Sequence, residues 1–179
     1  MSMAATVRRA ALGLGANLGD AAAALQGAVD VLAATDGVRV IAVSPVYETA
    51  PVGGPDQPRY LNAVVIVETA LAPVALLAAA HRAEQAFGRT RDVRWGPRTL
   101  DVDVLAIDGV ASDDPVLTLP HPRAHERAFV LVPWAQVDPT AMVGALGRVE
   151  VLLAALDDGD VADVARRDYL VLRVVEAAR

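Results

Sequence analysis

The stretch that decides the fold is Arg94-Trp95-Gly96-Pro97-Arg98-Thr99-Leu100-Asp101-Val102-Asp103-Val104-Leu105. Its second half alternates apolar and acidic residues with the period of a half-buried strand, which we predict to run from Leu100 to Ile107. On such a strand Asp101 and Asp103 project side by side from one face, while Val102 points to the other. The pattern therefore predicts a pair of neighbouring carboxylates on the surface of a sheet.

Two carboxylates one pleat apart can bind a hard divalent cation, and Mg²⁺ is usually held by one or two carboxylates together with phosphates and water. Four arginines lie within ten residues just before the pair, namely Arg89, Arg91, Arg94 and Arg98. Guanidiniums this close repel each other unless anions lie among them, and either a polyphosphate or protein carboxylates could serve. The Trp95 ring and the Gly96-Pro97 turn favour a metal-bound polyphosphate, and the alternative is an ordinary strand with an acidic face.

Length and composition exclude several classes of function. At 179 residues the chain is long enough for one domain, which we expect to span residues 1–179. A net charge of −6 argues against a nucleic-acid partner, because binding the phosphate backbone needs a broad basic surface. All sixteen basic residues are arginine, so a P-loop lysine, a protein-kinase lysine and a Schiff base are excluded. The absence of cysteine removes disulfides, thiol nucleophiles and thiolate zinc sites.

The N-terminus imitates a signal peptide, because Arg8-Arg9 precedes the apolar run from Ala10 to Gly15. That run is too short, and Asn17 interrupts the apolar character soon after it. No segment approaches the roughly 18 uninterrupted apolar residues of a membrane helix. We therefore expect a cytoplasmic protein with no membrane partner, and we expect a monomer.

The order of predicted elements is β-α-β-β-α-β, with segments at Val7–Leu14, Asp20–Ala34, Val38–Tyr47, Tyr60–Val67, Pro73–Phe87 and Leu100–Ile107. This order predicts an α+β fold, a ferredoxin-like two-layer sandwich with a mostly antiparallel sheet and helices on its face. Four further predictions cover the remainder: a helix at 123–137, a helix at 149–156, an acidic loop at 157–160 and a closing strand at 169–175.

Other features each allow more than one interpretation. The glycines from Gly13 to Gly19 resemble a dinucleotide fingerprint, although the third comes one residue late and a tight strand-to-helix connection explains them as well. The Pro- and Gly-rich stretch from Thr49 to Pro58 fits a lid, a pocket wall or a plain surface turn. Tyr60 and Asn62 share one face of a strand, where they could stack on and hydrogen-bond a planar heterocycle or simply pack across strands.

A zinc site is the weakest candidate. His121 and His125 are four residues apart, as in helical zinc motifs. Pro122 disrupts that geometry and the glutamate of His-Glu-x-x-His is missing, so we do not predict zinc.

Taken together, the motifs resemble those of the 6-hydroxymethyl-7,8-dihydropterin pyrophosphokinases of folate biosynthesis. The resemblance runs in order from Leu12 to Trp134 and is most specific in the Arg-Trp-Gly-Pro-Arg-x-Leu-Asp-x-Asp element. The motifs that carry it are Gly15-Ala16-Asn17-Leu18-Gly19, Thr49-Ala50-Pro51, Asp56-Gln57-Pro58-x-Tyr60-Leu61-Asn62, Glu84-x-x-x-Gly88-Arg89, the residues from Arg94 to Asp103, and Leu119-Pro120-His121-Pro122 with Arg127 and Phe129.

The resemblance implies that ATP gives its β,γ-pyrophosphoryl group to the hydroxymethyl oxygen of 6-hydroxymethyl-7,8-dihydropterin, leaving AMP. It also implies roles for residues of this chain. Asp101 and Asp103 would hold two Mg²⁺ ions, and Arg89 and Arg98 would contact the phosphates during transfer. The residues implied near ATP are Glu84, Arg91, Arg98, Thr118, His121 and Arg127. The residues implied around the pterin are Thr49, Pro51, Val52, Tyr60, Asn62, Trp95 and Phe129.

Two other functions remain open on the residues. One is a dinucleotide-dependent oxidoreductase that uses the turn from Gly13 to Gly19. The other is a non-catalytic ATP-binding regulatory module of ferredoxin-like fold, in which the arginines hold ATP and nothing is transferred. The tail after Pro139 carries no motif, and we expect it to do no more than complete the fold.

Overall fold

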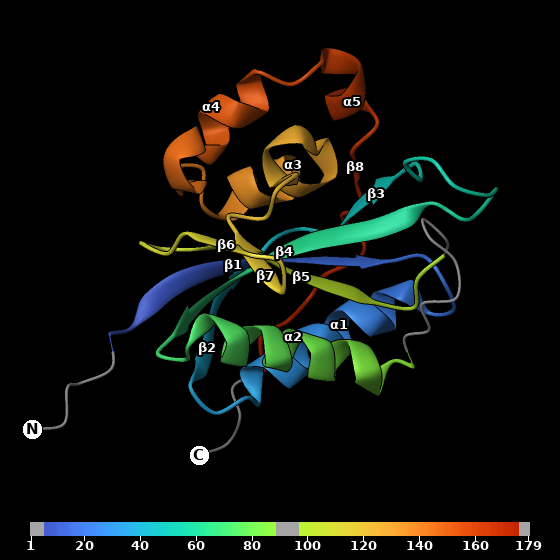
Figure 1. Cartoon of the computed structure of the whole chain (residues 1–179). Coiled ribbons are helices and arrows are strands. Elements are labelled where there is room, and N and C mark those ends of the chain that lie inside the picture. Colours follow the sequence, from blue (N-terminus) through green and yellow to red (C-terminus); the bar gives the residue numbers. More distant parts are fainter. Residues whose placement is uncertain (1–5, 89–96, 176–179) are drawn as a thin grey trace, which may run out of the picture.

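The computed structural model describes residues 6–88 and 97–175. Within these residues six strands form one antiparallel sheet in the order β5-β1-β4-β3-β8, and β2 also pairs with β4 (Figure 1). The strands of this sheet are β1 (Arg8–Ala16), β2 (Val38–Val43), β3 (Tyr47–Thr49), β4 (Tyr60–Thr69), β5 (Asp101–Ile107) and β8 (Ala165–Arg166). A separate hairpin is formed by β6 (Ser112–Asp114) and β7 (Leu117–Leu119). The expected α+β class and the antiparallel sheet are confirmed.

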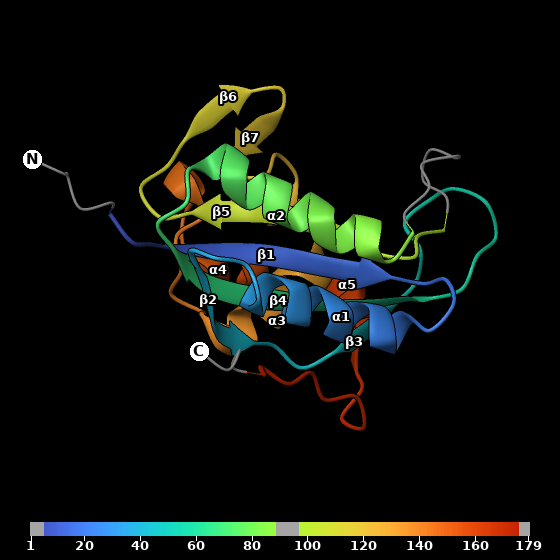
Figure 2. The same ribbon diagram turned by 90° about the horizontal axis from the view of Figure 1, so that it is seen from below.

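Helices cover both faces of the sheet, which adds a layer to the expected two. The helices α1 (Ala21–Ala33) and α2 (Pro73–Ala86) lie side by side beneath it (Figure 2). On the other face lie α3 (Ala128–Val137), α4 (Val149–Ala154) and α5 (Asp158–Ala162) (Figure 1). None of the helices within the described ranges has the length and apolar character needed to cross a bilayer.

The two helical layers explain the burial pattern of β5. Val102 and Val104 belong to the core beneath the sheet, while Asp101 and Asp103 on the opposite face are partly or fully exposed. From Leu105 onward every residue of β5 is buried, because Leu105 and Ala106 pack into the second core between the sheet and α3, and Ile107 packs into the first. The predicted alternation therefore holds only at the start of the strand, where α3 does not cover it.

The first strand is longer than predicted. It runs through Ala16, so Gly13 and Gly15 are strand residues and not part of a turn. The first glycine with left-handed backbone is Gly19, at φ 62°. The glycine-rich stretch therefore does not have the shape of a dinucleotide fingerprint, in which the glycines form the turn between strand and helix.

Two predicted segments are interrupted for local reasons. The strand predicted at Val38–Tyr47 divides into β2 and β3, because the buried Ser44 hydroxyl accepts a hydrogen bond from the Val64 N–H at 2.9 Å. The helix predicted at 123–137 begins as a 3₁₀ turn at Ala124–Glu126 and restarts as α3 after Arg127, whose backbone is extended.

The C-terminal predictions at 157–160 and 169–175 are wrong. The acidic residues predicted as a loop begin α5, where the Asp157 side chain caps the helix by accepting from the Gly159 N–H. The segment 169–175 is not a strand, although Leu170 and Leu172 do pack against the core as the alternation suggests. Its backbone bonds to the Gln26 side chain, which contacts both the N–H and the carbonyl of Arg173.

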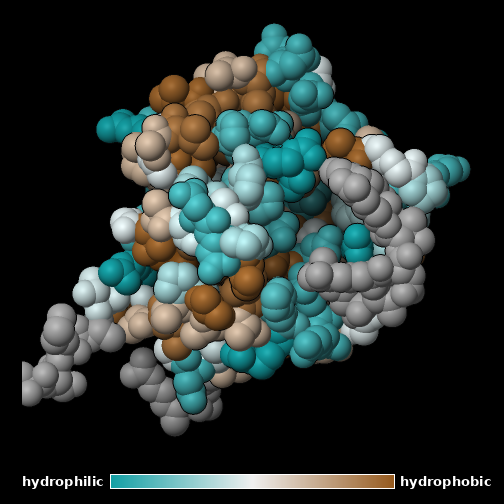
Figure 3. All heavy atoms as spheres, viewed as in Figure 1, coloured by the Kyte–Doolittle hydropathy of each residue, from teal (hydrophilic) through white to brown (hydrophobic). Residues whose placement is uncertain are grey.

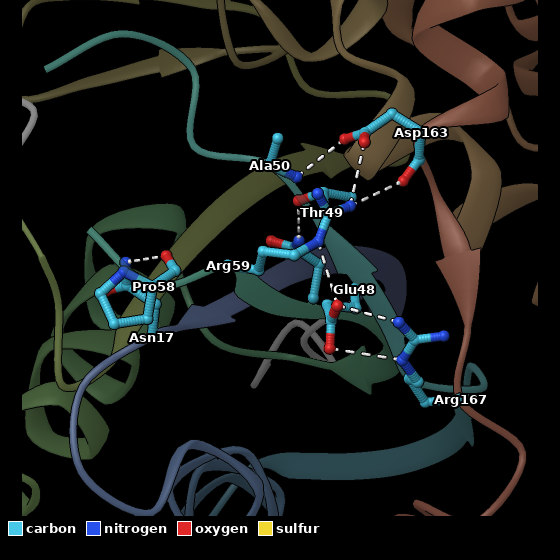
Figure 4. A network of polar contacts seen from close by, with 9 residues as sticks. Asn17, Glu48, Thr49, Ala50, Pro58, Arg59, Asp163 and Arg167 are labelled. Atoms are coloured by element: carbon cyan, nitrogen blue, oxygen red, sulfur yellow. Dashed lines mark hydrogen bonds and ion pairs between the residues drawn. The ribbon is translucent and has the colours of Figure 1, made fainter. Parts of the chain in front are cut away.

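Asn17 joins three segments that are distant in sequence. Its backbone N–H donates to the Arg98 carbonyl at 2.9 Å, and its side-chain oxygen accepts from the Arg98 N–H at 2.8 Å. Its side-chain NH₂ donates to the Pro58 carbonyl at 2.8 Å (Figure 4) and also to Gln57 Oε1 at 3.0 Å. With only 5% of its surface exposed, Asn17 is a buried connection between the end of β1 and the loops before β4 and β5.

Replacing Asn17 tests this connection. Asn17→Ala leaves the Arg98 N–H and the Pro58 carbonyl without their partner, so we expect it to lower the free energy of unfolding by about 1–3 kcal/mol. Gln57→Ala, the control, removes partly buried bonds from Asn17 and from the Tyr60 hydroxyl and should cost under about 1 kcal/mol. Urea denaturation measures both, and hydrogen exchange at the Arg98 amide should accelerate only in Asn17→Ala. Equal losses in the two variants would contradict the role of Asn17.

Candidate active site

A cavity of about 620 Å³ opens between the sheet and the layer that contains α3 and α5. Its lining comes from β1, β3, β4, β5, α3 and the segment after α5. Figure 3 shows hydrophilic residues gathered around a hollow between this helical layer and the sheet. The cavity therefore lies over the part of the sheet that the second core leaves uncovered.

Two glycines make the floor of the cavity. In the register of the sheet, Gly15 lies between Asp101 of β5 and Asn62 of β4, and Gly13 lies between Asp103 and Val64. Side chains of directly paired residues in an antiparallel sheet point to the same face. Because glycine has no side chain, the central strand leaves an open space between the carboxylates on one side and the amide on the other.

The paired carboxylates lie where the alternation predicts. Asp101 and Asp103 both line the cavity, and Val102 between them is buried on the opposite face. The Arg98 guanidinium lines the same cavity, with its Nε 3.9 Å from Asp101 Oδ2. Only 16% of the Arg98 side chain is exposed, so a cation is held inside the cavity next to the Asp101 carboxylate.

Polar and aromatic groups face the carboxylates across the glycine floor. Asn62 is buried and donates to the Thr49 hydroxyl at 2.8 Å, while Tyr60 lies two residues before it on β4, opposite Thr49. Burial is the main reason that the pKa of Tyr60 is raised, and the Asp101 carboxylate adds to it. Phe129 lines the cavity from α3, with the Arg127 guanidinium 5.5 Å from the centre of its ring. Val52 also lines the cavity, whereas Pro51 lies beside it, half-buried.

A second cavity of about 290 Å³ lies between α2, β5 and the β6–β7 hairpin. Thr118, His121 and Glu84 line it, three of the residues expected near a nucleotide. Asp103 lines both cavities and so marks the place where they meet. Buried Glu84 also has a structural contact, because its Oε1 accepts from the Val102 N–H at 2.9 Å and supports β5 from behind.

His121 is held as a neutral ring near neutral pH. Burial lowers its pKa, and Asp103 opposes that effect only in part. Its Nδ1 accepts from the Arg123 N–H at 3.2 Å, so the proton of the neutral ring lies on Nε2. Burial also lowers the pKa of Arg127, but an arginine so shifted stays charged near neutrality. His121 can therefore donate one hydrogen bond, and Arg127 brings a positive charge to the larger cavity.

Three of the expected site residues, Arg89, Arg91 and Trp95, lie outside the described residues. Several cavity-lining residues were not expected from the sequence: Gln57, Arg123, Glu126, Asp160, Asp163 and Val164. Gln57 could have been noticed, since it stands in a quoted motif beside Tyr60. The last three come from the tail after Pro139, which carries no motif and gives no such signal.

No group of three or more histidine, cysteine, aspartate or glutamate residues within 6–88 and 97–175 is arranged to hold a metal ion without help. The site thus offers two carboxylates to a cation whose other ligands must come from elsewhere. That donor set suits Mg²⁺, which is often bound by one or two carboxylates and by the phosphates of a substrate.

Comparison with known proteins gives the same picture. The model of the family 7,8-dihydro-6-hydroxymethylpterin-pyrophosphokinase (HPPK) matches residues 11–139. The chain is 49% identical over 156 residues to the 2-amino-4-hydroxy-6-hydroxymethyldihydropteridine pyrophosphokinase of Methylorubrum extorquens, covering 87% of this chain and 98% of that one. It is 44% identical over 126 residues to the Bacillus subtilis protein of the same name, covering 70% and 75% of the two chains.

The fold is also that of a solved structure. The crystal structure of wild-type Plasmodium falciparum HPPK-DHPS with pteroate matches with a TM-score of 0.68 and 14% identity, over 86% of this chain and 45% of that chain. At that identity the likeness concerns the fold only. The sequence match covers most of the chain and includes the residues of both cavities up to Phe129, and on this evidence the chain belongs to the 7,8-dihydro-6-hydroxymethylpterin-pyrophosphokinase (HPPK) family.

Proposed function

We propose that this chain transfers the β,γ-pyrophosphoryl group of ATP to the hydroxymethyl oxygen of 6-hydroxymethyl-7,8-dihydropterin, using the two cavities for the two substrates. One observation carries the proposal: Asp103 lines both cavities, with Asp101 and Arg98 beside it in the larger one. A pterin in the larger cavity and a nucleotide in the smaller one would meet at this pair of carboxylates. The reaction belongs to folate biosynthesis and leaves AMP.

The larger cavity has the shape and chemistry for a flat, polar heterocycle. Tyr60 and Phe129 offer aromatic faces from β4 and α3, and stacking on such rings contributes about 0.5–1.5 kcal/mol beyond burial. Asn62 is held in place by Thr49, so its amide can read the edge of a ring. The chain from Thr49 to Val52, with Pro51 in it, adds backbone groups at the same edge.

The smaller cavity is the proposed site of the nucleotide. Thr118 and His121 line it together with Glu84, and the neutral His121 ring has an Nε2–H to donate. Arg127 and Arg98 are cations on the side of the larger cavity, where the phosphates would pass. The resemblance assigns Arg89 and Arg91 to the phosphates and Trp95 to the pterin, and all three lie outside the described residues.

Asp101 and Asp103 would hold two Mg²⁺ ions together with the ATP phosphates. Their fit rests on the donor set: two carboxylates on one face of a strand, one of them exposed, at the boundary of both cavities. When bound, Mg²⁺ neutralises phosphate charge and orients the triphosphate for in-line attack.

The protein's own contribution is positioning and charge. The rigid strand β5 fixes the separation of Asp101 and Asp103, and Arg98 supplies a cation that can stabilise the charge shifting onto the AMP leaving group. Tyr60, Asn62 and Phe129 would hold the pterin with its hydroxymethyl group over the glycine floor. Burial of both substrates would keep water from competing as a nucleophile.

We further propose that the enzyme acts as a monomer in the cytoplasm. Support for the monomer comes from the two cavities, which a single chain lines with residues from the sheet, both helical layers and the C-terminal segment.

The direct test supplies purified protein with Mg-ATP and the pterin and separates the nucleotide products. AMP formed in step with pterin diphosphate supports the proposal, whereas ADP would mean transfer of a single phosphoryl group. ATP binding without turnover would instead favour a non-catalytic ATP-binding module, and NAD(P) binding would favour an oxidoreductase.

Removing either carboxylate should affect chemistry far more than folding. We expect Asp101→Ala and Asp103→Ala each to lower kcat by about 100-fold or more, or about 3 kcal/mol, because the metal-bound phosphates lose a ligand. Thermal unfolding should change little, since Asp103 is exposed and Asp101 partly so. Asp36→Ala, an exposed aspartate in the turn after α1, is the control and should retain wild-type rates. Wild-type rates in either site variant would defeat the metal assignment.

Removing the ring of Phe129 should change the KM for pterin more than the KM for ATP. We expect Phe129→Ala to raise the KM for pterin about tenfold and the KM for ATP less than about twofold, because the ring lines only the pterin cavity. Phe129→Leu keeps an apolar side chain without the aromatic face, so its KM for pterin should lie between those of wild type and Phe129→Ala. Steady-state kinetics with each substrate varied in turn measures the effect. A larger change for ATP would contradict the placement of the pterin between Tyr60 and Phe129.

A further inference from the structure

The tail of the chain returns to the larger cavity from the helical layer. After α5 it pairs as β8 with β3, with Arg166 opposite Tyr47 and Ala165 opposite Glu48. Just before that strand, Asp163 and Val164 line the cavity. The tail therefore builds one wall of a site whose other residues lie at least thirty positions earlier in the sequence.

Asp163 bonds to both ends of the loop between β3 and β4. One carboxylate oxygen, Oδ2, accepts from the Ala50 N–H at 2.7 Å, and the other, Oδ1, accepts from Arg59 at 2.9 Å (Figure 4). The Asp163 carbonyl also accepts from Arg59, at 3.3 Å. These contacts lower the pKa of Asp163, with the Ala50 N–H as the largest cause and Arg59 next, so the side chain is an anion at neutral pH.

Arg59 forms a second ion pair, with Glu48 of β3. Its Nε lies 3.0 Å from Glu48 Oε1, and the Arg167 guanidinium bonds to both Glu48 oxygens at 2.9 and 3.3 Å (Figure 4). The bonds alternate in charge along Asp163, Arg59, Glu48 and Arg167, so the two outer members come from the tail and the two inner members from β3 and the loop. Such a network fixes geometry better than any one exposed pair.

The position of this network matters because of its neighbours. Ala50 directly follows Thr49 and Arg59 directly precedes Tyr60, and Thr49 and Tyr60 face each other in the register of the sheet. Asn17 holds the loop only near its far end, at Gln57 and Pro58. At the Thr49 end the Asp163 bond to the Ala50 N–H ties the chain down before it becomes exposed at Val52.

We propose that Asp163 is a positioning residue for the pterin: it acts through Ala50 and Arg59 to set the edge of the site that Thr49, Asn62 and Tyr60 form. The inference rests on the proposed function, since it concerns the same pterin site. It gives the tail a role in binding the pterin that is separate from the metal and nucleotide residues. A carboxylate suits this role because it can accept from an amide and a guanidinium with different oxygens at once.

The test compares Asp163→Ala with Asp163→Asn and with Asp158→Ala, a change to an exposed aspartate of α5 that does not line either cavity. Steady-state kinetics should show a rise in the pterin KM of about tenfold for Asp163→Ala, with kcat and the ATP KM within about twofold of wild type. Asp163→Asn keeps one oxygen for the Ala50 N–H and should show a smaller rise. Asp158→Ala should behave as wild type, and hydrogen exchange at the Ala50 amide should accelerate in Asp163→Ala but not in Asp158→Ala.

Each outcome decides between the proposals. If wild type is active and Asp163→Ala keeps its pterin KM, or raises the ATP KM as much, the positioning role is wrong while the proposed function stands. If wild type forms no AMP, the proposed function fails and this inference fails with it. Should Asp163→Ala not fold, Arg59→Met removes the other partner and leaves the carboxylate and the Ala50 bond. A pterin KM unchanged in Arg59→Met would then overturn the proposal.

Discussion

The site depends on the absence of side chains at two positions of the central strand. Gly13 and Gly15 of β1 lie between the carboxylates of β5 and the polar residues of β4. An added Cβ at Gly15 would lie 3.3 Å from the Asn62 side-chain oxygen, and one at Gly13 would lie 3.3 Å from Leu105. A larger side chain at Gly15 would fill the space in which groups from β4 and β5 can act on one ligand.

The same face of the sheet therefore serves two purposes along its length. Where Ala11, Val64 and Leu105 project, α3 covers it and forms the second core. Where the glycines begin, the helical layer no longer fills the space and the cavity opens. The opposite face is largely apolar and packs on α1 and α2, which supports β5 beneath its two aspartates. The core beneath the sheet thus supports the strands where the cavity leaves their other face uncovered.

Much of this could be predicted from the sequence because the signals were local. The alternation from Leu100 to Val104 determines which face the aspartates occupy, and the structure agrees. The glycines were harder to interpret, since Gly13 and Gly15 fit a turn as well as a strand until the pairing with β4 and β5 is known. The division after Val43 falls at Ser44-Pro45, which is a local signal because proline has no N–H to donate to a sheet, whereas the extended backbone at Arg127 has no such signal in the sequence.

The sequence predictions were least successful for the tail after Pro139, because its structure depends on contacts with distant residues. Leu170 and Leu172 do pack against the core, but at Arg173 the Gln26 side chain takes both backbone bonds that a neighbouring strand would have made. Asp163 stands in an unremarkable acidic stretch, and its contacts with Ala50 and Arg59 join positions more than a hundred residues apart. Residues that position a site from a distance leave no motif, whereas residues that touch a ligand often do.

The most direct measurement of the account is pterin binding to Gly15→Val. Valine favours a strand, so the variant should still fold and unfold cooperatively, while its side chain stands on the cavity floor beside Asn62. Titration with the pterin, in the presence of Mg²⁺ and a non-hydrolysable ATP analogue, should show binding weakened at least about tenfold, or about 1.4 kcal/mol. A folded Gly15→Val protein that binds the pterin as tightly as wild type would contradict the claim that the bare central strand creates the site.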